Sequence, residues 1–351
     1  MQVPYWWLVI DVRSDTITLP SPNMRAAMAA AEVGDDVYQE DPTIAELEAK
    51  TADLLGHEAG LYVPSGTMSN LLGIWLSAQR GQEVLCDEQA HIVRAEHGSH
   101  AGLHGIMTRT WSSHGTGVAD AAVIADMIAP QAGFLVATAG VEIENTHNFG
   151  GGTVQPYDEL VAINKVCRAA GVNMHLDGAR LWNAHVATGV ALADYGRLFD
   201  TVSVCYSKGL GAPVGSVLVG RKDAIDRARL QRKALGGGMR QAGILAAGCL
   251  YALDHNIDRL ADDHEAASTF ARQVQELAPQ AISVLPQTNI VVMATGDRLA
   301  GEVVDAAKAA GVIVSGVGPH TVRAVTHMNV TIDQCRAAGA IVGSILAGET
   351  Q

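Results

Sequence analysis

Strand-length apolar runs alternate with helix-length segments along most of this chain. In the first repeat, Asp41 suits the N-cap of a helix, Pro42 suits its first residue, and Gly56 follows its last apolar residues. A strand-like run at 59–63 comes next, and the turn at 64–67 opens a second helical segment. Because elements that alternate in this way form a mostly parallel sheet covered by helices, the sequence predicts an α/β fold.

This alternation continues to about residue 275 and then changes. Up to that point, strand-like runs lie near 83–86, 105–110, 134–143, 172–177, 200–206 and 214–219, and helical segments lie near 118–129, 156–170, 222–234 and 241–278. Beyond it, strand-like segments at 281–285, 289–294, 312–315 and 321–326 surround a helical segment at 299–310, and a helical segment at 332–347 follows. We therefore expect a large domain over 1–275, which includes the N-terminal segment, and a small C-terminal α+β domain over 276–351.

The charge balance argues against nucleic acid as the main partner. The 351 residues include 37 acidic and 24 basic side chains, which gives a formal net charge of −13. An acidic chain of this kind repels phosphate backbones. Only 17% of the residues are charged, which is low for a monomer of this size and predicts extensive contacts between subunits.

The cysteines and the N-terminal region predict a cytoplasmic protein with no membrane contact. The apolar run from Tyr5 to Ile10 is too short for a signal sequence or a membrane span. The cysteines are widely spaced, contain no C-x-x-C pair and are typical of buried thiols in a reducing compartment. They are Cys86, Cys167, Cys205, Cys249 and Cys335.

Two residues at the ends of strand-like runs could carry cofactor chemistry. Lys208 follows the run at 200–206 beside a glycine, where a desolvated amine can form a Schiff base with an aldehyde cofactor. Asp177 ends the run at 172–177, and pyridoxal phosphate (PLP) needs a carboxylate at its pyridine nitrogen. Taken alone, Lys208 is more typical of a surface lysine, and Asp177 suits a helix N-cap equally well.

A third feature suits a phosphate group. Ser65, Gly66 and Thr67 form a turn before a helical segment, where backbone N–H groups can bind an anion, although such a turn alone is more typical of a simple helix cap. The glycine-rich run at 209–215 has neither the spacing nor the following helix of a dinucleotide-binding loop. A phosphate turn, a ring acid and a lysine in this order together favour PLP.

At this point the sequence resembles the L-threonine aldolase family of fold-type-I (aspartate-aminotransferase-type) PLP enzymes. The resemblance implies a large domain with a mostly parallel sheet and a small C-terminal domain. It implies retro-aldol cleavage of L-threonine, L-allo-threonine and related β-hydroxy-α-amino acids to glycine and an aldehyde, in a homotetramer with shared active sites. The matching stretches are 11–16, 33–38, 40–43, 64–68, 90–92, 144–148, 175–180, 207–210, 236–241 and 323–327.

The resemblance also implies roles toward the cofactor. Lys208 would hold PLP as a Schiff base, and Asp177 would pair with the ring nitrogen. His91 would stack on the ring and is one candidate for the general base, an ordered water being the other. The remaining cofactor contacts would come from Gly66, Thr67, Arg180, Ser207 and Arg240.

Toward the substrate, the resemblance implies that Ser14, Arg180 and Arg323 hold the carboxylate, for which a guanidinium is well suited. Tyr38 and Arg240 would reach a site across a subunit interface. Phe134 stands where some family members have a histidine near the substrate hydroxyl. We therefore expect Phe134 to line the substrate pocket and to favour bulkier substrates such as phenylserine.

Three alternatives stay open at this level. The same lysine and acid serve other fold-type-I reactions, namely β-elimination, transamination and racemisation. A catalytically inert PLP-fold binding protein is a second alternative. A metal site at His91, His97, His100 and His104 is the third, but glycines interrupt that segment and no acid joins it cleanly, so we expect no metal.

Overall fold

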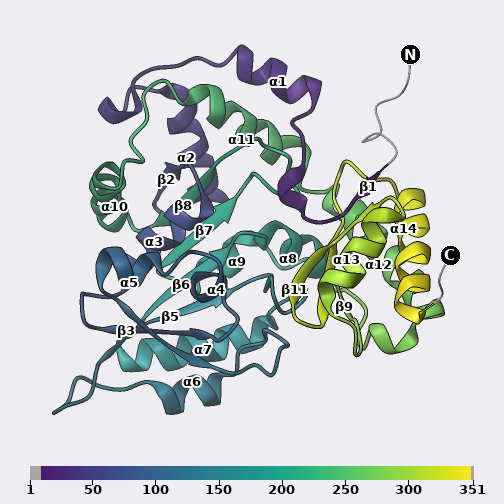
Figure 1. Ribbon diagram of the computed structural model, residues 1–351. Helices are drawn as coiled ribbons and strands as arrows, with labels where there is room; N and C mark the ends of the chain where they lie inside the picture. The colour runs from purple at the N-terminus through teal and green to yellow at the C-terminus, as the bar shows by residue number, and fades with distance from the viewer. Residues whose placement is uncertain (1–8, 349–351) are drawn as a thin grey trace. The chain divides into compact units, whose positions relative to one another are not determined.

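In the computed structural model, which describes residues 9–348, a seven-stranded sheet runs through residues 20–257 in the order β2-β8-β7-β6-β5-β3-β4 (Figure 1). Neighbouring strands are parallel except for β8, which is antiparallel to both β2 and β7. The predicted mostly parallel sheet is therefore confirmed. The strands are β2 (Ala59–Val63), β3 (Glu83–Asp87), β4 (Met107–Trp111), β5 (Thr138–Glu144), β6 (Asn173–Gly178), β7 (Thr201–Cys205) and β8 (Ser216–Gly220).

Helices cover both faces of this sheet, which explains why its strands read as continuous apolar runs. Leu61 of β2, Leu72 of α3 and Leu218 of β8 share one apolar cluster on the first face. On the other face α2 lies directly on β2, because a Cβ added to Gly60 would be 2.6 Å from the carbonyl oxygen of Glu48. The helices of this region are α1 (Pro22–Ala29), α2 (Pro42–Leu54), α3 (Gly66–Ser77), α4 (His91–Arg94), α5 (Ser99–His104), α6 (Ala121–Met127), α7 (Tyr157–Ala170), α8 (Leu181–Thr188), α9 (Leu192–Gly196), α10 (Lys222–Ala234) and α11 (Gly243–His255).

Local capping fixes where the first two long helices begin. The Asp41 carboxylate accepts the backbone N–H of Thr43 at 3.1 Å and of Ile44 at 3.0 Å, and Pro42 is the first residue of α2, as predicted. The Ser65 hydroxyl accepts the backbone N–H of Met68 at 3.2 Å and so starts α3 directly after β2. The N-terminus of α3 therefore lies at the carboxyl end of β2, an edge strand of the sheet.

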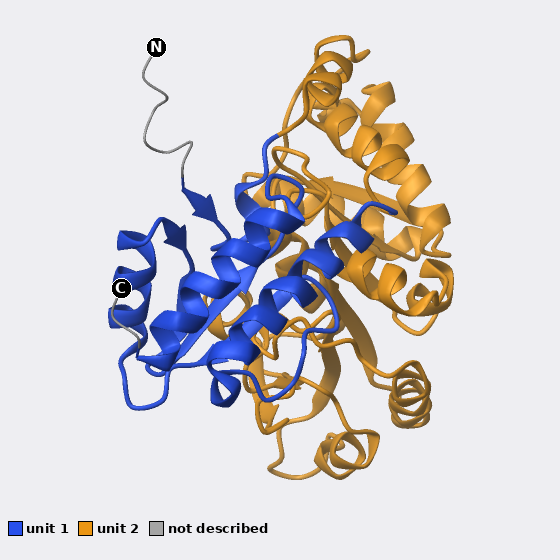
Figure 2. Ribbon diagram, turned by 90° about the vertical axis from the view of Figure 1, so that its right-hand side faces the viewer, with its two compact units in different colours: residues 1–19, 258–351 blue, residues 20–257 orange. Residues whose placement is uncertain are grey.

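The described chain divides into two compact units (Figure 2): unit 2 is 20–257, and unit 1 combines 9–19 with 258–348. Unit 1 has a three-stranded antiparallel sheet in the order β11-β12-β9 and a parallel pair of β1 with β10. A core of small apolar residues, together with Phe270 and Met293, fills it. Its elements are β1 (Ile10–Asp11), α12 (Leu260–Leu277), β9 (Ile290–Ala294), α13 (Ala300–Ala309), β10 (Val312–Ile313), β11 (Ser315–Gly318), β12 (Thr321–Val325) and α14 (Ile332–Ala347).

This division differs from the expected domain limits of 1–275 and 276–351. Helix α12 packs against α14 and therefore belongs to unit 1. Ile10 and Asp11 pair with Val312 and Ile313, so the N-terminal strand also belongs to unit 1. Residues 5–8 of the N-terminal apolar run lie outside the described residues.

Two predicted strands are corrected. Residues 281–285 form no strand: Ala281 ends a short 3-10 helix, and Val284 is exposed with no neighbouring strand to pair with. The run at 134–143 is a strand only from Thr138, because residues 134–137 are loop. In both cases an apolar run contains side chains that do not enter a core.

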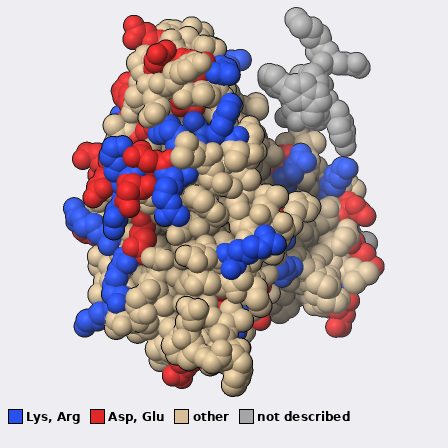
Figure 3. Space-filling view, turned by 90° about the vertical axis from the view of Figure 1, so that its left-hand side faces the viewer, with Lys and Arg blue, Asp and Glu red and all other residues tan. Residues whose placement is uncertain are grey.

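Unit 2 leaves several large apolar side chains in solvent. Leu230 is 76% exposed and Tyr38 is 72% exposed. On the face shown in Figure 3, acidic and basic side chains form a mixed patch at the upper left, and much of the surface below it is uncharged. Within residues 9–348, no helix has both the length and the apolar character that a membrane span requires.

Candidate active site

Asp177 lies near the carboxyl end of β6 and is only 1% exposed. Its carboxylate accepts hydrogen bonds from the side-chain amide of Asn70 at 2.7 Å and from the backbone N–H of Ala179 at 3.0 Å. Burial acts to raise the pKa of Asp177, but the charges of His91 and Lys208 more than offset it and hold this pKa below its usual value. The residue is therefore a buried carboxylate with cationic neighbours.

His91 is the first residue of α4 and belongs to the same polar cluster. Its Nδ1 lies 2.8 Å from a carboxylate oxygen of Glu96, which also accepts from Asn70 at 2.9 Å. Burial acts to lower the pKa of His91, but the bond to Glu96 and the charge of Asp177 raise it overall. His91, Glu96, Asn70 and Asp177 thus form one continuous chain of hydrogen bonds.

Lys208 lies on the loop that joins β7 to β8. Its Nζ is 3.4 Å from the sulfur of Cys205, the last residue of β7. Asp177 pairs in register with Ser203 of β7, so the lysine and the acid lie at the same edge of the sheet. Two backbone hydrogen bonds fix the loop. The N–H of Gly211 donates to the carbonyl of Lys208 at 2.9 Å, and the N–H of Tyr206 donates to the carbonyl of Gly215 at 3.1 Å.

The predicted phosphate turn lies beside this loop. A Cβ added to Gly66 would be 2.7 Å from the Cys205 sulfur, so only glycine allows the start of α3 to approach the end of β7 this closely. Thr67 and Ser207 are half-buried. The backbone N–H groups of a twelve-residue helix are therefore available to an anion next to Lys208.

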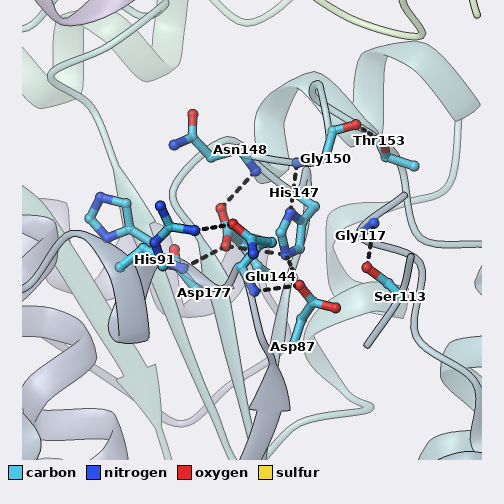
Figure 4. A network of polar contacts seen from close by, with 12 residues as sticks. Asp87, His91, Ser113, Gly117, Glu144, His147, Asn148, Gly150, Thr153 and Asp177 are labelled. Carbon is cyan, nitrogen blue, oxygen red and sulfur yellow. Dashed lines mark hydrogen bonds and ion pairs between the residues drawn. The ribbon is translucent and has the colours of Figure 1, made fainter. Parts of the chain in front are cut away.

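Arg180 follows β6 directly and is buried. Its guanidinium donates to the side-chain oxygen of Asn148 at 3.2 Å. Asn148 lies in the loop after β5, within the buried polar network shown in Figure 4. A guanidinium presents a planar pair of N–H donors, which suits a carboxylate.

The residues of unit 2 fit PLP by the chemistry of their donors. A buried carboxylate suits a protonated ring nitrogen, a lysine suits the aldehyde, and a helix N-terminus suits the phosphate. At Gly66, any side chain would fill the space between the start of α3 and the end of β7. His91, Glu96 and Asp177 also place ligand-type atoms within 4.8 Å of one another, which among residues 9–348 is the one such group of potential metal ligands.

Phe134 does not lie in this cluster. Phe134 is 97% exposed in the loop before the amino end of β5, whereas the cluster lies at the carboxyl ends of the strands. Phe134 therefore lies outside this cluster, because the strand starts four residues later than predicted, and its expected place in a substrate pocket stays a prediction. Ser14 and Arg323 belong to unit 1, where Ser14 caps a short helix and Arg323 lies on β12, and their predicted roles stay predictions.

Tyr38 and Arg240 lie at the surface of unit 2. Tyr38 ends a short 3-10 helix, and Arg240 forms an ion pair of 2.9 Å with Asp35. Their predicted role across a subunit interface is consistent with this exposure and stays a prediction.

Sequence reasoning missed Asn70, Glu96 and Glu144 as site residues. Asn70 lies about one helical turn after the phosphate turn, so its spacing on α3 was an available signal. Glu144 ends β5 and pairs in register with Asp177, a relation that only the strand order reveals.

Comparisons with known proteins agree on one family. A family model described as beta-eliminating lyase matches residues 11–297. The chain is 47% identical over 271 residues to an uncharacterized protein of Caenorhabditis elegans, covering 77% of this chain and 66% of that protein. It is 38% identical over 339 residues to the low specificity L-threonine aldolase of Escherichia coli (strain K12), covering 97% of this chain and 100% of that one.

A solved structure of SPT with a PLP internal aldimine has a TM-score of 0.75 and 15% identity, covering 97% of this chain and 89% of that one. At this identity the likeness concerns the fold, and it confirms the expected fold type I.

Proposed function

Because the chain belongs to the beta-eliminating lyase family, we propose that it is a low-specificity L-threonine aldolase. Such an enzyme cleaves the Cα–Cβ bond of L-threonine or L-allo-threonine to give glycine and an aldehyde. The observation that carries this reaction is the 38% identity to the Escherichia coli aldolase over 97% of this chain and the whole of that protein.

PLP is the proposed cofactor, and when bound it supplies an electron sink for the electron pair released from the Cα–Cβ bond. Asp177 would face its ring nitrogen, His91 its ring face, and Lys208 its aldehyde carbon. Gly66, Thr67 and Ser207 would contact its phosphate. Support comes from the buried Asp177 carboxylate and from the approach of the α3 N-terminus to the end of β7.

The substrate carboxylate is the proposed ligand of Arg180, which Asn148 holds at 3.2 Å. Ser14 and Arg323 are proposed to complete this contact. His91 is proposed to accept the β-hydroxyl proton, directly or through a water that it orders. Because Nδ1 of His91 is bonded to Glu96, the other ring nitrogen, Nε2, would exchange this proton.

A cytoplasmic homotetramer is the proposed form of the protein. The exposed Tyr38 and Leu230 support subunit contacts, and five free buried cysteines support a reducing compartment. Tyr38 and Arg240 are proposed to complete a neighbouring subunit's site. Light scattering of the purified protein would give its mass, and a monomer would contradict this assembly.

The deciding experiment is aldehyde release from L-threonine, L-allo-threonine and L-phenylserine, with and without added PLP. We expect release that requires PLP and falls by roughly three orders of magnitude in Lys208→Ala, because the lysine is the only covalent anchor proposed. Cofactor binding without aldehyde release would move the function to β-elimination, transamination or racemisation. Assays for keto acid and for inverted amino acid would separate these reactions.

A further inference from the structure

We infer that Glu144 is a positioning residue that couples His91 on the cofactor side of the site to Arg180 on the substrate side. This inference deepens the proposed function and rests on it. Glu144 is the last residue of β5, is 5% exposed, and pairs in register with Asp177 (Figure 4). Its two carboxylate oxygens accept hydrogen bonds from two different segments of the site.

The first oxygen, Oε2, fixes the start of α4. It accepts the backbone N–H of His91 at 2.9 Å. The N-cap residue Ala90 has no side chain that could make this bond, and no side-chain cap bond forms there. A first-turn N–H of a helix needs an acceptor, and a carboxylate is a favourable one. Glu144 therefore fixes the backbone position from which the His91 side chain extends.

The second oxygen, Oε1, fixes the loop after β5. It accepts the backbone N–H of Asn148 at 2.8 Å. The side chain of the same Asn148 accepts from the Arg180 guanidinium at 3.2 Å. A shift of Glu144 would thus move Asn148 and, through it, the proposed ligand of the substrate carboxylate.

A closely packed histidine faces Glu144. Nε2 of His147 lies 3.8 Å from Glu144 and 3.4 Å from Asp87. The backbone N–H of Gly150 donates to Nδ1 at 3.0 Å, which places the ring proton on Nε2, facing the two acids. Gly117 packs directly on this ring, because a Cβ added to Gly117 would be 2.4 Å from the Cγ of His147.

Glu142 provides a matched control on the same strand. It lies two residues earlier and therefore on the same face of β5, and it is 1% exposed. Neither of its carboxylate oxygens has a hydrogen-bond partner among the described residues, and burial raises its pKa well above the usual value. Truncating Glu142 removes a buried acid of the same size without touching the backbone of His91 or Asn148.

The test compares Glu144→Ala and Glu144→Gln with Glu142→Ala. For each variant we would measure the Kd for PLP by titrating the cofactor-free protein, the KM and kcat for L-threonine, and the melting temperature. Glu144→Ala is expected to raise both the Kd and the KM about tenfold, which is the scale of one lost charged hydrogen bond in each arm. Glu144→Gln keeps one acceptor oxygen, so it should recover part of this loss. Glu142→Ala should change the melting temperature alone.

Asn148→Ala separates the two arms. It should raise the KM and leave the Kd for PLP unchanged, and the KM of the double variant with Glu144→Ala should not exceed that of Glu144→Ala alone, because both changes break the same connection. If the Glu144 variants match Glu142→Ala in Kd and KM, the inference is overturned. If the wild type binds PLP but releases no aldehyde, the proposed function fails instead, and the Kd comparison still tests the His91 arm.

Discussion

The carboxyl edge of the sheet in unit 2 and the interior of unit 1 are both buried, but the first consists of charged side chains and the second of apolar ones. At the sheet edge, Asp177, Glu96 and Glu144 are nearly inaccessible, and each accepts hydrogen bonds from side chains or backbone of neighbouring elements. In unit 1, the core consists mostly of alanine and valine around Phe270 and Met293.

The two regions therefore contribute differently to activity and to stability. Buried charges need partners and are costly to hold, so a concentration of them at one edge favours a function over a structural role. Apolar side chains contribute through the area they remove from water, which is non-directional. Changes at the edge should therefore affect activity, and changes in the unit 1 core should affect folding.

The largest effect is expected from Asp177→Asn, which replaces the buried charge by an amide of the same shape. We expect kcat for L-threonine to fall about 10²–10³-fold, because the ring nitrogen of PLP would lose its charged partner. The melting temperature of the cofactor-free protein should stay near that of the wild type. A variant that melts much lower while keeping most of its kcat would erase the contrast between the two regions.

In the unit 1 core, Phe270→Ala should do the reverse. Phe270 is fully buried on α12, and its removal should lower the free energy of unfolding by about 3–5 kcal/mol, since a cavity is left in a closely packed core. Urea unfolding would measure this loss, and kcat per folded molecule should change less than twofold. A strong loss of kcat in a sample that is fully folded would show that this core also contributes to catalysis.

A smaller and pH-dependent effect is expected from His264 of α12. Burial lowers the pKa of His264 to about 4, below its value of 6.5 in an unfolded chain. Between these values the folded state binds fewer protons than the unfolded state, so the free energy of unfolding falls as the pH falls. His264→Gln should remove part of this dependence, on the order of 1 kcal/mol between pH 7 and pH 5. Urea unfolding of both proteins at the two pH values would measure this difference. An equal loss of unfolding free energy in the wild type and the variant would show that His264 has no such role.

The sequence predicted those parts of the fold that local patterns determine. Helix α14 has its predicted limits because Thr331 and Gln334 form a capping box at its start. Lys208 and Asp177 were predicted at the sheet edge because each ends or follows an apolar strand. These positions depend on neighbours within a few residues, which a single sequence contains.

The rest depends on the order of strands, which the sequence does not contain. Glu144 meets the backbone of His91 because a strand from residues 138–144 lies between β3 and β6. Glu96 and Asn70 meet because α3 crosses above β6. Phe134 was misplaced because periodicity alone does not separate an exposed apolar loop from the start of a strand.

The antiparallel direction of β8 has a consequence for repeated turnover. Two parallel neighbours would need a crossover of a dozen or more residues, whereas β7 and β8 are joined by the short loop 206–215, with both ends anchored in the sheet. A lysine on a loop that is anchored at both ends has little freedom to move away from the sheet edge. If Lys208 anchors PLP as proposed, this loop would keep its amine at a high effective concentration beside the cofactor, so that rebinding of the cofactor would compete with its escape into solvent.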